Sequence, residues 1–518
     1  MSEASKNKQV IINIIASLVS CLVSTGISFV LSPIIIAETG AQGGGYLELA
    51  TQFVNYAAIA ATALNSMGGR FITIKLHQKD EQGANEYFNS ILYCNIGIVA
   101  FLAIPVFFVV HYLDRLINID PTLTSDVKLL FAANFVNFMV TIISTTFSTA
   151  TFATNRLDLT ALRTIESQIL RAALLVLAFW LLPVKMYYMG LATLAASVYL
   201  WLFYMHYTKK LLPQIKISRS YFNLRRIIEI LSAGIWNTVM RTGQVLTNYL
   251  DSLIANKMIG RSEFGYVGTS KEVITAINAL YEAVSAVFTP SLTISFAKDN
   301  KDELVADLNS AMKVTGFFAN IPLAFMIAFG LDFYALWLRT LTPEEVHTIY
   351  LLSILAMFGT IVGGAISPLF NVYTVVNKLK WNSFVTLFMG ILSVGIVVSL
   401  LLVMPDRSKY GPYVIVGTST VLGIIKNMTF TPMYAAHCLN LKKRSFYPVI
   451  LRYIAVSAAM IGIFCGIHQI MPATGWMMLL ACVIVCGIVG AALNFFLLFG
   501  KRERLLLADF LAKRLRRS

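Results

Sequence analysis

The sequence predicts an all-α integral membrane protein with about fourteen transmembrane helices. Of the 518 residues, 57% are hydrophobic and only 13% are charged, whereas about 25% of the residues in an ordinary soluble domain are charged. The hydrophobic residues gather in runs of roughly 17 to 28 residues, the length that an α-helix needs to cross a bilayer. The polar segments between these runs are short, so no sizeable domain is expected outside the membrane.

The expected spans lie at about 10–37, 47–69, 90–110, 127–148, 165–182, 190–207, 230–254, 265–289, 311–330, 348–373, 381–403, 411–431, 448–470 and 476–499. The first run is longer than the core of a signal peptide and has no small-residue cleavage site after it, so it is expected to be a retained anchor. With these spans, the side of the membrane that holds both termini carries about 28 Lys and Arg residues, and the opposite side carries about 7. Both termini are therefore expected in the cytoplasm.

The sequence shows no sign of nucleic-acid binding, metal binding or catalysis. The net charge of +15 follows the loop asymmetry of a membrane protein and does not indicate nucleic-acid binding. The six cysteines lie in or beside apolar runs, and the six histidines are scattered without metal-ligand spacing. There is no GxxxxGK[ST] phosphate loop, no HExxH motif and no Ser/His/Asp arrangement. We expect no metal, no cofactor and no enzymatic activity, which leaves transport.

Two of the expected spans carry charge on one face. At steps of three and four they hold Asn237, Arg241, Gln244, Asn248 and Asp251 in the first, and Lys271, Thr275, Asn278, Glu282 and Ser285 in the second. Placing one charge in the hydrocarbon centre costs at least about 2.5 kcal/mol. These faces are therefore expected to meet each other or a wet cavity.

Two interpretations of these charges stay open. In one, Arg241 with Asp251 and Lys271 with Glu282 are ion pairs that lock helices together. In the other, the faces line a water-filled pathway, and Arg241 and Lys271 meet an anionic cargo. The uncharged hydrogen-bonding groups on the same faces favour the pathway. Lys426, about one turn from the cytoplasmic end of its span, fits either a cavity or a side chain that reaches the interface.

The sequence also contains a repeat. A shift of 220 residues without a gap lays residues 72–90 over 292–310 and pairs Gly40 with Gly260. Six spans separate the copies, an even number, so the repeat is parallel. It predicts two six-helix lobes with a cleft between them and two peripheral C-terminal helices. The expected parts are an N-terminal lobe at 1–208, a cytoplasmic linker at 209–229, a C-terminal lobe at 230–440, peripheral spans at 441–499 and a basic cytoplasmic tail at 500–518.

The N-terminal lobe has polar faces with less charge. Spans one and two carry Ser17, Ser24, Ser28, Thr51, Asn55 and Thr62. Such small groups indicate either close helix packing or a cavity wall. Arg171 is expected near the cytoplasmic end of the fifth span, where an arginine usually reaches for the interface; a cavity role is the alternative.

Four stretches resemble polysaccharide flippases of the multidrug/oligosaccharidyl-lipid/polysaccharide exporter superfamily. They are LSAGIWNTVMRTGQVLTNYLDSLIANKMIG, FGYVGTSKEVITAINALYEAVSAVFTPSLTISFAKDN, FATNRLDLTALRTIE and LDFYALWL. The resemblance covers about residues 10–450 and implies a two-lobed fold of fourteen or twelve helices in the bacterial inner membrane. It implies that the chain moves an undecaprenyl-pyrophosphate-linked oligosaccharide, such as an O-antigen unit, from the cytoplasmic to the periplasmic leaflet.

The resemblance also implies roles for residues. Arg241 and Lys271, with Lys426, would hold the pyrophosphate, while Asn237, Asn248 and Asn278 contact sugar. The implied partners are the lipid-linked substrate, membrane lipids and polysaccharide polymerase or assembly proteins. In the same fold the alternative is a cation-coupled multidrug exporter, in which Asp251 and Glu282 bind a proton or sodium. A membrane polymerase or ligase is disfavoured by the short external loops.

Overall fold

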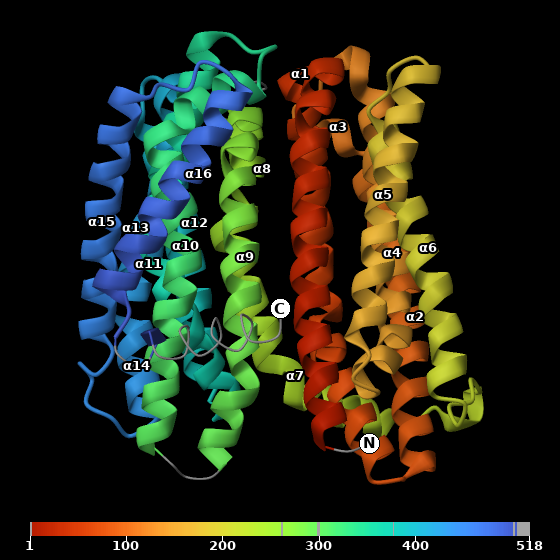
Figure 1. Ribbon diagram of the computed structural model, residues 1–518. Coiled ribbons are helices and arrows are strands. Elements are labelled where there is room, and N and C mark those ends of the chain that lie inside the picture. The colour runs from red at the N-terminus through yellow and green to blue at the C-terminus, as the bar shows by residue number, and fades with distance from the viewer. Residues whose placement is uncertain (1–2, 261–262, 298–300, 377, 501–502, 505–518) are drawn as a thin grey trace. The chain divides into compact units, whose positions relative to one another are not determined.

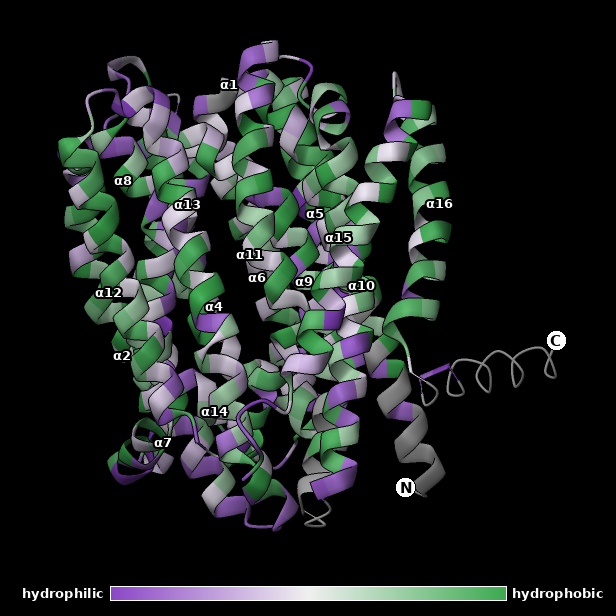
Figure 2. Cartoon of the chain, turned by 90° about the vertical axis from the view of Figure 1, so that its left-hand side faces the viewer, coloured by the Kyte–Doolittle hydropathy of each residue, from purple (hydrophilic) through white to green (hydrophobic). Residues whose placement is uncertain are grey.

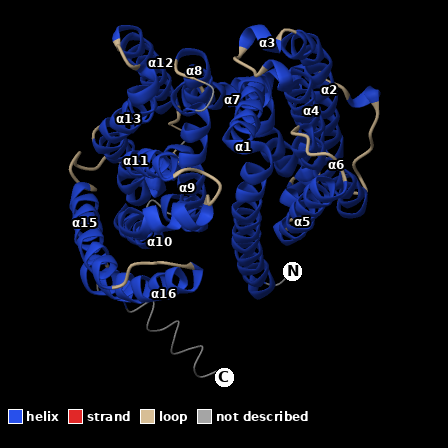
Figure 3. Ribbon diagram, turned by 90° about the horizontal axis from the view of Figure 1, so that it is seen from above, coloured by secondary structure: helices blue, strands red, loops and turns tan. Residues whose placement is uncertain are grey.

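The computed structural model is built from α-helices joined by short loops (Figures 1 and 3). It describes residues 3–260, 263–297, 301–376, 378–500 and 503–504. Within these ranges there is no β-strand, which confirms the predicted all-α class. Figure 2 shows hydrophobic residues predominating along the long helices and hydrophilic residues gathering in the loops between them, as expected for helices in lipid.

The helices have the following bounds: α1 Glu3–His77, α2 Glu81–His111, α3 Leu113–Leu116, α4 Thr124–Ala153, α5 Leu157–Leu181, α6 Tyr187–Leu211, α7 Leu224–Gln244, α8 Asp251–Met258, α9 Glu263–Ala297, α10 Lys301–Trp337, α11 Pro343–Val375, α12 Lys380–Val403, α13 Arg407–Met428, α14 Phe430–Cys438, α15 Tyr447–Ile470 and α16 Trp476–Leu493. The 3-10 segments are Pro121–Leu123 and Arg219–Tyr221. The π-helical segments are Val245–Tyr249 and Asn494–Leu498.

In the described part of the chain, 11 helices are long and apolar enough to cross a membrane. The expected spans at 47–69, 230–254 and 265–289 are not among them. All three carry polar stripes, and each polar residue lowers the mean hydropathy of its segment. The prediction of a multi-pass helical fold is confirmed, and the count of fourteen spans stays a prediction.

Helix α1 combines the first two expected spans. Its path breaks at Gly40, where φ is +73° and ψ is 173°. Residues that carry a Cβ rarely adopt this backbone conformation, so glycine is the residue expected at the break. The two arms of α1 are therefore separate membrane-length segments joined without a loop.

The predicted repeat is visible in the positions of the helices. Helices α10, α11, α12 and α13 begin 220, 219, 223 and 220 residues after α2, α4, α5 and α6. The shift found in the sequence therefore also describes the secondary structure, although few residues are identical between the copies.

The chain divides into two compact units. Unit 1 comprises Met1–Gly268 and Ser383–Pro412, and unit 2 comprises Thr269–Asn382 and Tyr413–Ser518. The lobe boundaries expected from the repeat stay a prediction. Each unit is described by itself below.

Glycines bring three helices of unit 1 into close contact. A Cβ added at Gly234 in α7 would lie 2.1 Å from the backbone oxygen of Ala63 in α1. A Cβ at Gly243 would lie 2.5 Å from the backbone carbonyl carbon of Thr386 in α12. Helix α7 is therefore packed backbone against backbone on two sides, as small residues allow in membrane proteins.

The segment that leads from α6 to α7 is held by polar side chains of α2. Asn85 accepts from the backbone N–H of Lys216 at 2.7 Å and donates to the carbonyl of Gln214 at 3.0 Å. Asn89 accepts from the backbone N–H of Ser218 at 2.9 Å and donates to the carbonyl of Lys216 at 2.8 Å. The two amides pair with residues 214–218 as a neighbouring β-strand would, so the backbone groups of Gln214, Lys216 and Ser218 that they bind are satisfied.

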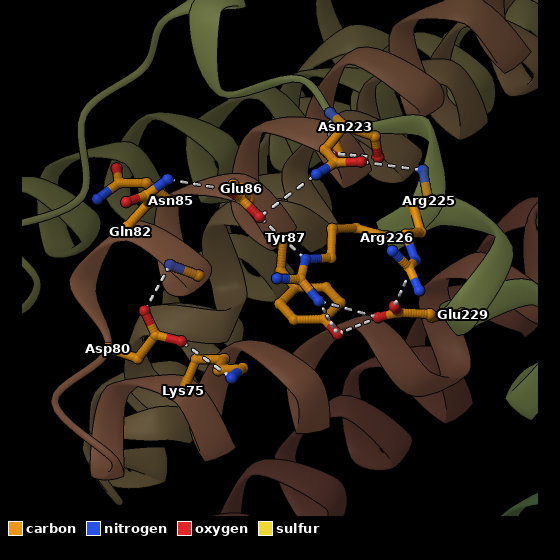
Figure 4. Close-up of polar contacts among 12 residues, drawn as sticks. Lys75, Asp80, Gln82, Asn85, Glu86, Tyr87, Asn223, Arg225, Arg226 and Glu229 are labelled. Carbon is orange, nitrogen blue, oxygen red and sulfur yellow. Dashed lines mark hydrogen bonds and ion pairs between the residues drawn. The ribbon is translucent and has the colours of Figure 1, made fainter.

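The same segment ends in a network of charges shown in Figure 4. The guanidinium of Arg226 donates to Glu86 at 2.9 Å and to Glu229 at 3.2 Å. It lies 4.9 Å from the ring centroid of Tyr87, whose hydroxyl donates to Glu229 at 2.5 Å. Asn223 caps the start of α7 by accepting from the N–H of Arg225 at 3.0 Å. The first turn of α7 is thereby fixed to α2.

In unit 2 the residue aligned with Ser90 by the repeat is Ser310, and it binds the segment after α16. The Ser310 hydroxyl donates to Glu503 at 2.7 Å, and Lys313 forms an ion pair with the same carboxylate at 3.1 Å. Glu503 is 4% exposed. Burial alone would raise the pKa of this carboxyl, but the bonds from Ser310, Lys313 and the N–H of Gly500 outweigh it and hold the pKa below its usual value of 4.5.

This contact predicts a pH dependence. A carboxyl with a lowered folded-state pKa stabilises the fold above its unfolded pKa and loses this effect as the pH falls through the folded pKa. Wild-type protein should unfold at a higher temperature than Glu503→Gln above pH 4.5, and the difference should shrink as the pH falls below 4.5 through the lowered folded-state pKa. Thermal unfolding of the purified chain across this range is the measurement. A difference that stays the same at every pH would contradict an ionised Glu503 held by these bonds.

Candidate functional site

The second arm of α1 and helix α7 face each other in unit 1 through a ladder of polar contacts. Asn237 donates to the Ser66 hydroxyl at 3.1 Å, and Arg241 donates to the Asn55 side-chain oxygen at 2.5 Å. Beyond α7, Gln52 donates to Ser252 at 2.9 Å. The polar stripes predicted on these spans therefore contact each other, and Asn237 and Arg241 take part.

Arg241 is half-buried. Among the described residues of unit 1, no carboxylate lies within 4.0 Å of its guanidinium. Its neighbours are Asn55 and the ring of Tyr249, whose centroid lies 5.1 Å from the guanidinium carbon. An aromatic face and an amide oxygen stabilise a cation without neutralising it. The charge stays available to an anion.

The ion pair of Arg241 with Asp251, one of the two interpretations left open by the sequence, is absent from unit 1. The cause lies in the backbone. After Gln244 the helix widens into a π turn, in which the N–H of Leu250 donates to the carbonyl of Val245 at 3.2 Å. Such a turn holds an extra residue and changes the side to which the following residues point. Asn248 is exposed, and Asp251 at the start of α8 is 3% exposed.

The π turn also completes the surroundings of Arg241. It delivers the Tyr249 ring to the guanidinium, while the Tyr56 hydroxyl of α1 donates to the Tyr249 carbonyl at 2.6 Å. π turns within α-helices occur frequently at functional sites. We therefore place the candidate site of unit 1 around Arg241, Asn55 and Tyr249.

The remaining predicted site residues lie in unit 2. On α9, Lys271 and Asn278 are half-buried and Glu282 is exposed. The side-chain oxygen of Asn278 is buried and has no hydrogen-bond partner in the part of the chain that the structure describes. A buried carbonyl oxygen left in this way costs about 1–3 kcal/mol, which is typical of a group that serves a ligand or a water molecule.

Lys426 on α13 is half-buried, and its ammonium lies 5.8 Å from the ring centroid of Phe370 on α11. The next residue of α11, Asn371, donates to Ser285 of α9 at 3.3 Å. The structure thus connects the polar face of α9 with the helix that packs beside Lys426. The roles assigned to Lys271, Asn278, Glu282 and Lys426 stay predictions.

Sequence reasoning placed Asn55 in a polar stripe but did not assign it to the site, and it missed Tyr249. A stripe of polar residues on span two opposite an arginine on span seven was a usable signal for Asn55. No sequence signal marks the π turn, so the position of Tyr249 could not be foreseen. In the described residues, no three His, Cys, Asp or Glu side chains gather where they could hold a metal ion.

This fold has been seen in solved membrane transporters. The inward closed conformation of the lipid II flippase MurJ superposes with a TM-score of 0.67 at 14% identity, covering 94% of this chain and 99% of that chain. An outward-facing multidrug resistance MATE family transporter of the MOP superfamily superposes with a TM-score of 0.64 at 12% identity, covering 84% and 97%. At such identities the likeness establishes the fold. The chain is a multi-pass membrane protein with a transporter fold.

The chain belongs to the family of polysaccharide biosynthesis proteins, whose model matches residues 10–296. A relative in Bacillus subtilis (strain 168), the uncharacterized membrane protein EpsK, is 27% identical over 498 residues, which cover 95% of this chain and 96% of the relative. The resemblance to the polysaccharide flippases of the multidrug/oligosaccharidyl-lipid/polysaccharide exporter superfamily is thereby confirmed.

Proposed function

We propose that this chain is a flippase that moves an undecaprenyl-pyrophosphate-linked oligosaccharide from the cytoplasmic to the periplasmic leaflet of the bacterial inner membrane. Both termini lie in the cytoplasm, and the cycle is one of alternating access. The family, with its role in polysaccharide biosynthesis, supports the cargo class. Polysaccharide polymerase or assembly proteins are the partners that would receive the cargo.

The observation that carries this proposal is the state of Arg241. A half-buried guanidinium that faces an amide oxygen and an aromatic ring, with no carboxylate within 4.0 Å among the described residues of its unit, retains most of its donors for a ligand. Arginine binds phosphate oxygens in bidentate fashion, and such charge-assisted bonds contribute about 1.5–3 kcal/mol each. Arg241 and Lys271, with Lys426, hold the pyrophosphate, while Asn237, Asn248 and Asn278 contact sugar.

The double variant Arg241→Gln, Lys271→Gln tests the proposal. Surface polysaccharide should fall to below about one tenth of the wild-type amount, because at least one charge-assisted contact to phosphate is lost. Single repeat units on their lipid should accumulate in the inner leaflet, while the amount of protein in the membrane stays normal. Polysaccharide would be measured on whole cells with a glycan-specific label. Unchanged polysaccharide would refute the role of these cations.

The matched control is Arg225→Gln. The Arg225 side chain is 88% exposed and lies 4.0 Å from Glu229, so the same chemical change removes a solvated charge outside the candidate site. Polysaccharide should stay at the wild-type amount. Loss of polysaccharide in this control would show that the assay responds to total charge and not to the site.

The burial of Asp251 supports a second candidate, the cation-coupled multidrug exporter. A carboxylate that is 3% exposed at the start of α8 is a place where a proton or sodium ion binds in transporters. In this case Asp251 and Glu282 bind the coupling ion. A deletion strain should then become sensitive to cationic drugs and keep its polysaccharide, which is the opposite of the result expected for the flippase.

A further inference from the structure

Arg171 is half-buried in unit 1 and lies further from the start of its helix than the expected span at 165–182 suggests. Helix α5 begins at Leu157, so Arg171 stands fourteen residues, or about 21 Å, from its start. Helix α5 therefore starts a full two turns earlier than the span predicted at 165–182.

The face of α5 that carries Arg171 is its buried face. The residues one turn before and after it on this face, Ser167 and Leu175, are 1% and 3% exposed. The opposite face, with Ile169 53% and Leu177 47% exposed, is the one that suits contact with lipid. Arg171 therefore points into the unit.

Arg171 is half-buried and has few partners. Its only hydrogen-bond partner in the described structure is the Ser28 hydroxyl of α1, at 3.3 Å, and its Nε is buried without an acceptor. A guanidinium carries five N–H donors. Among the described residues of unit 1, no carboxylate lies within 4.0 Å of it.

A second cation of the same helix shows what a structural arginine looks like here. Arg163, two turns before Arg171 on the same face, forms an ion pair with Glu166 at 2.5 Å and donates to the Tyr207 hydroxyl at 2.9 Å. Its guanidinium also lies 4.3 Å from the ring centroid of Phe203. Arg163 is satisfied within the protein, and Arg171 is not.

One turn from Arg171 lies a further incomplete polar group. The side-chain oxygen of Gln168 is buried and has no hydrogen-bond partner among the described residues. Residues three apart are neighbours on a helix surface. An arginine with spare donors and an amide with a spare acceptor thus stand side by side, next to the exposed Ser28.

We infer that Arg171, Gln168 and Ser28 form a second phosphate-binding subsite, inside unit 1 and separate from Arg241. The ligand has several anionic oxygens for the guanidinium and hydroxyl groups for the Gln168 oxygen, as a phosphate joined to a sugar has. That this phosphate belongs to the transported cargo rests on the proposed function. The phosphate of a membrane lipid headgroup has the same anionic oxygens, and the experiment distinguishes the two.

The test uses the purified full-length chain in detergent, titrated with farnesyl pyrophosphate as a short soluble probe. Arg171→Gln should weaken binding at least about tenfold, Arg171→Lys should restore part of it, and Ser28→Ala should weaken it about two- to threefold. Arg225→Gln is the control and should bind as wild type does. Unchanged binding in Arg171→Gln, or no binding by the wild type, would overturn the subsite.

Two further measurements sharpen the result. Since Arg171→Gln removes a buried charge without an ion-pair partner, its unfolding temperature should equal or exceed that of the wild type; a clear fall would show a structural role and overturn the inference. Displacement of the probe by an equal concentration of phosphatidylglycerol would assign the subsite to lipid headgroups and overturn the assignment to cargo.

The subsite and the proposed function can fail separately. Loss of probe binding in Arg171→Gln, together with normal polysaccharide in the Arg241→Gln, Lys271→Gln variant, supports the subsite and refutes the proposed function. Unchanged probe binding in Arg171→Gln, together with lost polysaccharide in the double variant, overturns the subsite alone.

Discussion

Replacement of Gly234 by alanine is expected to lower the unfolding temperature by roughly 5 °C or more and to reduce the amount of protein in the membrane. The added methyl group would stand 2.1 Å from the Ala63 carbonyl oxygen, 2.8 Å from its carbon and 2.9 Å from its Cα. All three are backbone atoms, so no side chain can rotate away. Helices α1 and α7 must separate, and the polar ladder between them opens.

Gly97→Ala is the matched control for this prediction. Gly97 lies within α2 of the same unit, and a Cβ there would meet nothing within 4 Å. The same substitution should leave the unfolding temperature within about 2 °C or raise it, because alanine favours a helix more than glycine does. Thermal unfolding of the purified proteins measures both. Equal stability of the two variants would contradict the close approach of α1 and α7.

Replacement of Asn89 by leucine is expected to destabilise unit 1 by about 2 kcal/mol and to release the segment that joins α6 to α7. Asn89 is fully buried. Its loss leaves the carbonyl of Lys216 and the N–H of Ser218 without their partner on α2. Lys216 is exposed and Ser218 is half-buried, so water replaces part of what is lost, and each lost hydrogen bond costs about 0.5–1.5 kcal/mol.

Limited trypsin digestion measures the release directly, since Lys216 and Arg219 lie in the segment. Cleavage there should be faster in Asn89→Leu than in wild type. Asn89→Asp should give an intermediate rate, because the carboxylate still accepts from Ser218 but no longer donates to Lys216. Gln82→Leu is the control, since Gln82 is exposed and its side chain donates to Glu86 at 3.2 Å. Cleavage at the wild-type rate in Asn89→Leu would contradict the role of this amide.

The fold could be predicted from the sequence because a helix that crosses a lipid bilayer needs an apolar run of a characteristic length. Runs of membrane length predicted most of the helices, and the 220-residue shift predicted that α10 begins at Lys301 when α2 begins at Glu81. Asn237 and Arg241, which lie on one of the polar stripes, contact Ser66 and Asn55 of α1; the roles predicted for them stay predictions. These features depend on periodicity and composition alone.

The candidate site was harder to predict from the sequence because it depends on the path of the backbone. The π turn before Tyr249 puts Asn248 and Asp251 in different environments, although regular helical spacing groups them with Arg241. The start of α5 at Leu157 puts Arg171 fourteen residues into its helix, whereas the expected span begins only six residues before it. Side chains that bind loop backbones, such as Asn85 and Asn89, are also invisible to periodicity, because their partners are distant in sequence.

The glycines at 234 and 243 restrict how this transporter can move. With backbone against backbone on both sides of α7, there is no layer of side chains to slide or repack when the helix shifts. The second arm of α1 and helix α12 must therefore move together with helix α7, and the three helices behave as one rigid body. Any bending of the backbone during a transport cycle has to occur outside this rigid body, and the break in α1 at Gly40 is one position where it can occur.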